Sequence, residues 1–288
     1  MVDDIGAIAN CGQDSLILNS YINTQIELKK LRFHVPDAQG RTKCHKLHVG
    51  CKSSRCPILK VHGTVMEEVE YDEYLGDVIS NDGKNKMNLR KRISRGMGII
   101  TQIMNILESV SYGHHFIEIA LLLRESMFIS SILNNVEVWY GLTRSEVETF
   151  EKLDLILLRR ILSAPSSTPI ESFYLELGLL PLGTVIKSRR IKYLHYLLSR
   201  DKSEMLSQFF WAQWKKPGRQ DWTEAVRQDL ADFGMSADPE LLKKYSKYSF
   251  KKVVKDKATE FTFNNLMKIK EKHSKLSALS YYELRAQT

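Results

Sequence analysis

The sequence contains no window that approaches the roughly 18 consecutive apolar residues of a membrane-spanning helix. It also lacks the basic region, apolar stretch and small-residue cleavage site of an N-terminal secretory signal. Four cysteines in 288 residues are too few for a disulfide scaffold, so reduced thiols are expected. No internal repeat or low-complexity tract is evident. These absences predict an intracellular globular protein with no membrane partner.

The composition is that of an ordinary globular protein with an excess of positive charge. Hydrophobic residues make up 43% of the chain, which is ample for one large or two modest domains. The 42 basic residues outnumber the 34 acidic ones, giving a net charge of +8 and a pI near 9.1. This charge favours a polyanionic partner, with nucleic acid as the leading candidate and an acidic membrane surface as the alternative.

The period of the hydrophobic pattern changes along the chain. Apolar residues recur at near-helical spacing over Gln13–Leu31, which predicts an amphipathic helix. Alternating segments then predict short strands at Cys44–Gly50, Ile58–His62 and Val65–Val69, ending at Tyr74–Ser80 before the turn signal Asn81–Gly83. Beyond this turn the pattern predicts helices over 84–109, 115–141, 143–163, 168–178, 182–200, 203–214, 220–233, 238–246 and 248–272. The expected fold class is α+β, mostly α.

Two local signals mark helix ends in the second half of the chain. Thr143 followed by Glu146 predicts an N-cap with acidic support. The proline-rich segment Pro165–Pro169 interrupts the helical pattern and is the best subdomain boundary there.

Asp3 and Asp4 place two adjacent carboxylates at the start of an apolar-flanked segment. Neighbouring carboxylates repel one another unless a cation neutralises them, and hard oxygen ligands suit Mg²⁺. Two metal ions held by aspartates can clamp the attacking and leaving oxygens of nucleotidyl transfer. Taken alone, however, adjacent aspartates more often form a turn or a helix start, so the rest of the chain decides between the two interpretations.

The Val-Asp-Asp segment at residues 2–4 is followed by a helix, a lysine-containing strand at Thr42–Cys44, and a turn into a basic helix. This order resembles the end of the palm and the thumb of a reverse transcriptase. The resemblance is to non-long-terminal-repeat (LINE-like) retrotransposons of the clade that carries a restriction-like endonuclease. It extends over nearly the whole chain through the stretches Tyr74–Lys84, Leu121–Ser126, Tyr174–Gly178 and Lys272–Leu276.

The resemblance implies a distal palm of short antiparallel strands and a helix over 1–82, a helical thumb over 83–165 and a helical linker or C-terminal region over 166–288. The parent activity it implies is Mg²⁺-dependent, RNA-directed DNA polymerisation in the nucleus. The implied partners are an RNA template and a DNA primer, bound as an RNA–DNA hybrid.

The resemblance also assigns roles to single residues. Asp3 and Asp4 correspond to the aromatic-x-Asp-Asp metal site of the palm, with Met1 where the family has Tyr or Phe. The family's other metal-binding Asp, its nucleotide-binding residues and its fingers lie upstream and have no counterpart here. Because two carboxylates without the third do not define a two-metal site, the chain is expected to be an N-terminally truncated fragment that is inactive alone.

Further roles follow from the same resemblance. Lys43 corresponds to the lysine proposed to protonate the leaving pyrophosphate, with Lys46 and Lys29 as competitors for that general-acid role. The primer-grip turn corresponds to Tyr74, Leu75 and Gly76, where glycine lets backbone approach the primer strand. The alternative to an enzyme fragment is a non-catalytic nucleic-acid-binding helical protein or a decayed retrotransposon remnant.

A group of thiols and imidazoles comprises Cys44, His45, His48, Cys51 and Cys56. Their spacing matches no usual two-plus-two zinc pattern, and successive residues of a strand point to opposite faces. Scattered thiols and surface imidazoles are the favoured interpretation, so no zinc is predicted.

A basic run at the start of the thumb is the strongest candidate for nucleic-acid contact. No acidic residue occurs from 84 to 107. On a helix Lys84, Lys91 and Arg95 fall near one face and Lys86 and Arg90 near another, while Met87, Ile93 and Met97 face inward. Phosphate contact is predicted for Lys84, Arg90, Lys91 and Arg95. A weaker second cluster comprises Lys187, Arg189, Arg190 and Lys192, and the lysines of 251–257 are interpreted as a solvated helix face.

Overall fold

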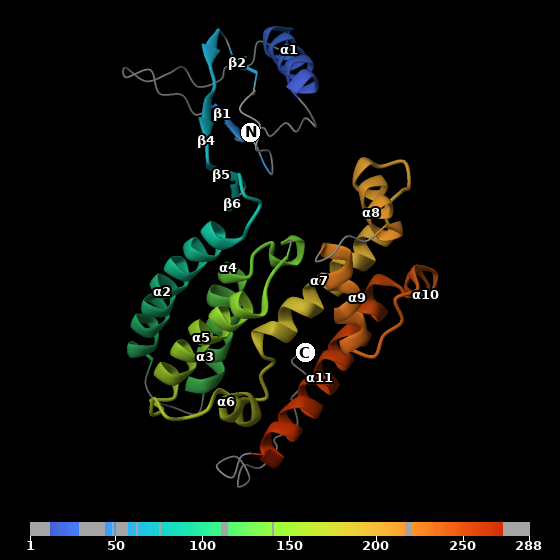
Figure 1. Ribbon diagram of the computed structural model, residues 1–288. Helices are drawn as coiled ribbons and strands as arrows, with labels where there is room; N and C mark the ends of the chain where they lie inside the picture. Colours follow the sequence, from blue (N-terminus) through green and yellow to red (C-terminus); the bar gives the residue numbers. More distant parts are fainter. Residues whose placement is uncertain are drawn as a thin grey trace. The chain divides into compact units, whose positions relative to one another are not determined.

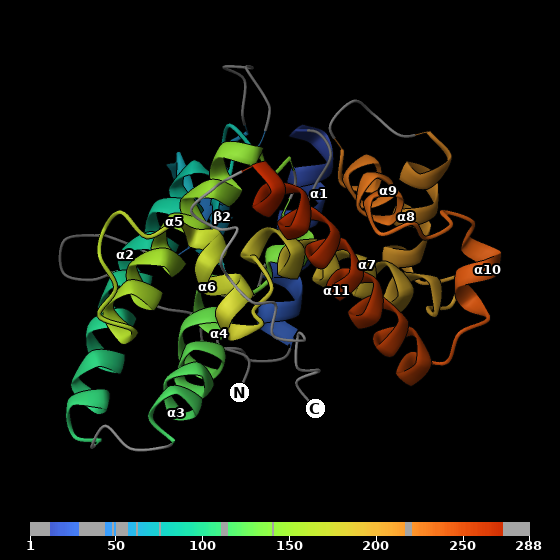
Figure 2. The same cartoon turned by 90° about the horizontal axis from the view of Figure 1, so that it is seen from below.

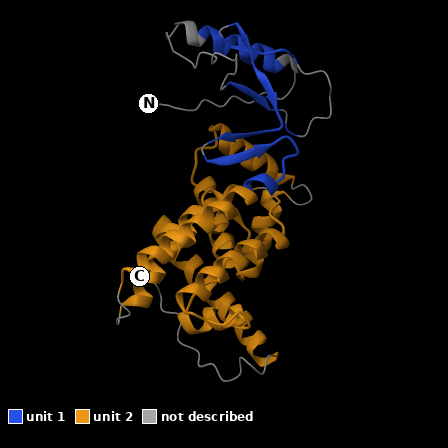
Figure 3. Cartoon of the chain, turned by 90° about the vertical axis from the view of Figure 1, so that its left-hand side faces the viewer, with its two compact units in different colours: residues 1–88 blue, residues 89–288 orange. Residues whose placement is uncertain are grey.

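The computed structural model describes residues 12–28, 44–47, 49, 57–61, 63–74, 76–110, 115–139, 141–216 and 221–272. The chain divides into two compact units, residues 1–88 and 89–288 (Figure 3). Helices dominate the described residues, and the strands are few and short (Figure 1). The expected α+β, mostly α, fold class is therefore confirmed.

In the first unit, one helix and three strand pairs are described. Helix α1 spans Gly12–Leu28. β1 (His45–Leu47) pairs in parallel with β4 (Glu67–Val69), β2 (Lys60–Val61) pairs antiparallel with β3 (Thr64–Val65), and β5 (Tyr71–Tyr74) pairs antiparallel with β6 (Asp77–Ser80). Asn23 on α1 donates its Nδ2–H to the carbonyl oxygen of Lys60 at 2.7 Å, which connects α1 to β2. Three large apolar side chains of α1 are exposed, namely Leu16, Ile17 and Tyr21.

The second unit begins within a long basic helix. Its first group of helices consists of α2 (Lys86–Glu108), α3 (Phe116–Leu123), the π-helix η1 (Arg124–Ile129), α4 (Ser130–Ile132), the 3-10 helix η2 (Val136–Val138) and α5 (Arg144–Ile161). Their apolar side chains form one cluster around Ile103, Phe128 and Phe150, all fully buried. A buried ion pair accompanies it, in which Nε and Nη2 of Arg124 donate to the two carboxylate oxygens of Asp154 at 2.8 and 2.6 Å. Burial makes such a pair costly unless both oxygens are bonded, as they are here.

The remaining helices are arranged around α7. They are α6 (Ile170–Leu177), α7 (Leu182–Leu198), α8 (Met205–Lys215), α9 (Trp222–Asp232), α10 (Pro239–Lys243) and α11 (Lys247–Lys272). Helix α7 contacts α5, α9 and α11 (Figures 1 and 2). Its N-terminal half buries Ile186 in the cluster shared with α2 and α5, and its C-terminal half buries Leu194 in a second cluster with α9 and α11. This one helix therefore belongs to two of the unit's three apolar clusters, and the third lies around Leu158, Phe173 and Leu266.

Most predicted elements have counterparts at nearly the predicted positions. The capping box at Thr143 is confirmed, because its amide donates to Glu146 Oε2 at 2.7 Å and its Oγ1 accepts from the Glu146 amide at 3.3 Å. The helix predicted over 115–141 instead ends at Ile132. Asn135 then adopts a left-handed conformation with φ of 56°, which stops the helix, and the chain continues as the 3-10 helix η2.

Candidate nucleic-acid interface

Four predicted site residues lie outside the described residues, namely Asp3, Asp4, Lys43 and Leu75. Their roles in metal binding, proton donation and primer contact stay predictions. Within the described ranges, no three side chains of Asp, Glu, His and Cys gather where they could hold a metal ion. Of the five zinc candidates, Cys44 and His45 are described, and His45 Nδ1 lies 3.3 Å from Asp72 Oδ1.

The β5–β6 hairpin positions the two described residues of the predicted primer grip. Tyr74 is the last residue of β5, pairs with Asp77 and is 37% exposed. Gly76 has a φ of 86°, and a Cβ added there would meet no atom within 4 Å. Glycine is therefore favoured at this position by the backbone conformation rather than by a lack of space for a side chain.

Lys84 lies just before α2 in a turn that an aspartate organises. Asp82 accepts hydrogen bonds from the Ser80 hydroxyl at 2.6 Å and from the Lys84 amide at 2.9 Å. These bonds, with the nearby Lys84 charge, lower the pKa of the exposed Asp82 carboxyl. The predicted turn at 81–83 is confirmed, and part of the Lys84 charge is offset by the aspartate.

Helix α2 buries one of its arginines. Arg92 is 1% exposed, and its Nη1 and Nη2 donate to the carbonyl oxygens of Ser131 at 2.9 Å and Asn134 at 3.3 Å. It thus satisfies carbonyl groups at the end of the α3–η1–α4 segment, which an ending helix leaves without intrahelical partners. The prediction that Met97 faces inward is wrong, because Gly96 occupies the buried position and Met97 is 38% exposed.

Arg90 and Arg95 present their charges to solvent. Both are exposed, and within the described part of the chain neither side chain has an ion pair or hydrogen bond. Lys91 is half-buried and lies one helical turn before Arg95. The predicted grouping of Lys91 and Arg95 on one face therefore holds, with Arg90 on the neighbouring exposed face.

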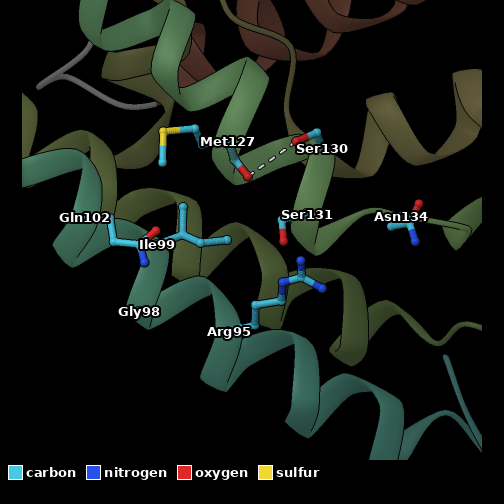
Figure 4. Close-up of a pocket in the computed structure, with 8 residues that line it drawn as sticks. All are labelled: Arg95, Gly98, Ile99, Gln102, Met127, Ser130, Ser131 and Asn134. Atoms are coloured by element: carbon cyan, nitrogen blue, oxygen red, sulfur yellow. Dashed lines mark hydrogen bonds between the residues drawn. The ribbon is translucent and has the colours of Figure 1, made fainter. Parts of the chain in front are cut away.

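Arg95 lies at a polar cavity of about 540 Å³, shown in Figure 4. The cavity lies between α2 and the segment that contains η1 and α4. Its lining residues are Arg95, Gly98, Ile99, Gln102, Met127, Ser130, Ser131 and Asn134. The Arg95 guanidinium and the Ser131 hydroxyl point toward one another in Figure 4. Ser131 Oγ is buried and has no hydrogen-bond partner among the described residues.

This arrangement is suited to an anionic oxygen. No Asp or Glu lines the cavity, whereas a guanidinium, two amide side chains and two hydroxyl groups do. Arginine and hydroxyl side chains are common ligands of phosphate groups in proteins. Of the lining residues, Gln102 lies seven positions after Arg95 and could have been found from helical periodicity. Ser131 and Asn134 could not, because they come from another helical segment.

The second basic cluster has a different role from the first. Arg190 donates through Nε and Nη2 to the carboxylate of Asp229 at 2.7 and 2.9 Å, and Lys187 pairs with Asp232. Arg189 Nη1 donates to the carbonyl oxygen of Leu133 at 2.5 Å. These three residues are engaged in contacts between helices, so the weak prediction of phosphate contact loses its basis for them.

Among the described helices, none combines the length and apolar character needed to cross a lipid bilayer. Comparisons of the chain with protein-family models, with curated proteins and with solved structures gave no match. The functional argument therefore depends on the residues themselves.

Proposed function

We propose that the chain is a C-terminal part of a non-long-terminal-repeat retrotransposon reverse transcriptase, and that α2 binds the backbone of an RNA–DNA hybrid. The observation that carries the binding proposal is the pair of unpaired, exposed guanidinium groups of Arg90 and Arg95 on a stretch with no acidic residue from 84 to 107. The family assignment is supported by the sequence resemblance and by the mostly helical body that follows the short strands.

Arg90 and Arg95 present their guanidinium groups on two faces of α2. Five residues of helix rise about 7.5 Å and turn about 140° beyond one full turn, so the two side chains diverge. Each arginine can therefore contact a separate phosphate. Arg95 also lies at the polar cavity, which no Asp or Glu lines, so no carboxylate there competes with a phosphate for the guanidinium.

In the parent enzyme, Mg²⁺ held by Asp3 and Asp4 would supply the charge that nucleotidyl transfer requires. Lys43 would donate a proton to the leaving pyrophosphate, and Tyr74, Leu75 and Gly76 would position the primer. The third carboxylate and the fingers have no match in this sequence. These 288 residues alone are therefore expected to bind nucleic acid without polymerising it. Upstream coding sequence that carries the missing Asp would favour the enzyme, and a transcript that begins at Met1 would favour a binding protein.

The binding proposal is tested by fluorescence anisotropy of a labelled RNA–DNA hybrid over a series of salt concentrations. Arg90→Glu with Arg95→Glu should weaken binding at least about tenfold and reduce the slope of log K against log salt by about two. The matched control is Lys215→Glu with Lys216→Glu, which changes the net charge equally at exposed positions at the end of α8. Circular dichroism should show the same helix content in all three proteins.

Two results would overturn the proposal. One is that the unaltered chain fails to bind the hybrid at low salt. The other is that the control pair weakens binding as much as the α2 pair, which would mean that net charge alone attracts the hybrid.

A further inference from the structure

A second cavity, of about 320 Å³, lies in the second unit between α7, α10 and α11. Its lining includes five basic residues: Lys192, His195, Lys243, Lys247 and Lys251. The four lysines define a lysine pocket. No Asp or Glu lines this pocket, which sets it apart from the paired residues Lys187 and Arg190 on the same helix α7.

The lysine charges are largely uncompensated. Lys243 pairs with the exposed Glu240 at 3.3 Å. In the described part of the chain, Lys192, Lys247 and Lys251 have no ion pair or hydrogen bond from their side chains. Lys192 is half-buried, and burial together with the nearby charges of Lys251, Arg189 and Lys255 lowers its pKa.

The aromatic wall of the pocket is held in place by specific contacts. The His195 ring stacks on Phe250 with the ring centroids 4.3 Å apart, and its Nε2–H donates to the carbonyl oxygen of Tyr245 at 3.1 Å. These contacts join α7 to the chain between α10 and α11. The lysines therefore converge on a cavity with a fixed wall rather than along a loose surface.

We propose that the lysine pocket binds a dianionic phosphate group of the kind carried by a phosphomonoester. Like charges brought together without acidic partners are destabilising, and a bound dianion would offset that cost. Lysine is a common phosphate ligand because its ammonium group acts as a compact point charge. The cavity has the volume of about ten water molecules, enough for a phosphate and part of the group it esterifies.

The phosphomonoester has two possible sources, a free nucleotide or the 5′-phosphate end of a nucleic-acid strand. The proposal does not rest on nucleic-acid binding by α2, because no residue of α2 lines this pocket. The two proposals can therefore fail separately.

The test is isothermal titration of the full chain with inorganic phosphate at constant ionic strength. Lys192→Met with Lys251→Gln should weaken phosphate binding at least about tenfold. The control, Lys244→Gln with Lys252→Gln, removes the same charge from neighbouring exposed residues outside the pocket and should leave binding unchanged. Without phosphate, the Lys192→Met change should also raise the melting temperature, because it removes a half-buried charge.

The result that would overturn the proposal is no phosphate binding at millimolar concentration, or equal weakening by the control pair. If the double variant fails to fold, Lys247→Gln tests the same pocket from an exposed position. The Arg90→Glu, Arg95→Glu protein should keep the phosphate binding that Lys192→Met with Lys251→Gln removes.

A second experiment distinguishes a free nucleotide from the 5′-phosphate end of a strand. It compares the binding of two oligonucleotides of one sequence, one with and one without a 5′-phosphate. A preference for the phosphorylated strand that Lys192→Met with Lys251→Gln abolishes identifies a strand end. Equal binding of both strands, with phosphate binding intact, identifies a free phosphate compound.

Discussion

Arg90 and Arg92 lie two positions apart on α2 and face opposite environments. Arg90 is exposed and has no bonded partner among the described residues. Arg92 is buried and bonds the carbonyl oxygens of Ser131 and Asn134. Sequence periodicity placed both in one basic run, because residue type alone does not distinguish a ligand-binding arginine from one that holds two helices together.

Substitution of Arg92 should lower the stability of the protein, whereas substitution of Arg90 should weaken nucleic-acid binding. Arg92→Met is expected to lower the free energy of unfolding by about 2–3 kcal/mol, since it leaves buried carbonyl groups without donors. Arg90→Met should change stability by less than about 0.5 kcal/mol and weaken hybrid binding instead. Urea unfolding followed by circular dichroism measures the first effect, and equal losses of stability in the two variants would contradict it.

Glu151 is a second residue whose environment gives a directional prediction. It lies on α5 and accepts a hydrogen bond from the Gly183 amide at 3.2 Å, in the first turn of α7. Burial raises the pKa of its carboxyl group, and the neighbouring carboxylates Asp154, Glu148 and Glu171 add to this rise. Because the folded pKa lies above the unfolded one, this residue's contribution to stability is lost as pH rises through the folded value.

Glu151→Gln should therefore stabilise the protein at pH 7 by at most about 1 kcal/mol, a gain limited by partial exposure to water. The difference between the variant and the parent should shrink as pH falls through the raised pKa and disappear below the ordinary carboxyl pKa of the unfolded chain, where Glu151 is neutral in both states. Thermal unfolding at several pH values measures this difference. A gain that persists unchanged at low pH would show that charge is not its cause.

At the scale of the element, α2 has three sides with different tasks. One side packs in the core, one lines the polar cavity through Arg95 and Gln102, and one is open to solvent. The opposite wall of the cavity contains Met127 of the π-helix η1. Helical turns of this type are rare in proteins, and those that occur are often found at functional sites. The sequence predicted α2 and its basic face because both depend on local spacing.

Neither the Arg95 cavity nor the ion pairs of the α7 side chains could be predicted from the sequence, because both depend on contacts between segments that are distant in the chain. Ser131 and Arg95 line one cavity only because α4 packs near α2. Likewise, Arg190 and Lys192 look alike in sequence, but Asp229 of α9 neutralises only the first of them.

Two glycines of α2 give a matched test of this packing. A Cβ at Gly96 would lie 2.5 Å from Leu153 Cδ2 and 3.0 Å from Ile132 Cγ2, both in the core. Gly96→Ala should therefore cost about 1–2 kcal/mol. A Cβ at Gly98 would meet nothing within 4 Å, so Gly98→Ala should stabilise the helix by about 0.5–1 kcal/mol. Urea denaturation of the two variants should give opposite signs, and a shared sign would contradict this packing of α2.

At the scale of the whole molecule, the net charge of +8 is distributed unevenly among structural and available cations. Arg92, Arg124, Arg189 and Arg190 are used within the helical unit. Arg90, Arg95 and three of the pocket lysines, Lys192, Lys247 and Lys251, have no ion pair among the described residues. The net charge favours a polyanionic partner, and the structure separates the cations that are engaged in internal contacts from unpaired cations such as these.

The exposed apolar side chains of α1 have a consequence for handling the purified protein. Leu16, Ile17 and Tyr21 leave 48%, 64% and 60% of their surfaces in water, and they lie within about one and a half turns of one helix. Such a patch favours contact between molecules. At high concentration copies of the chain will adhere through α1, and light scattering will report larger particles before any nucleic acid is added.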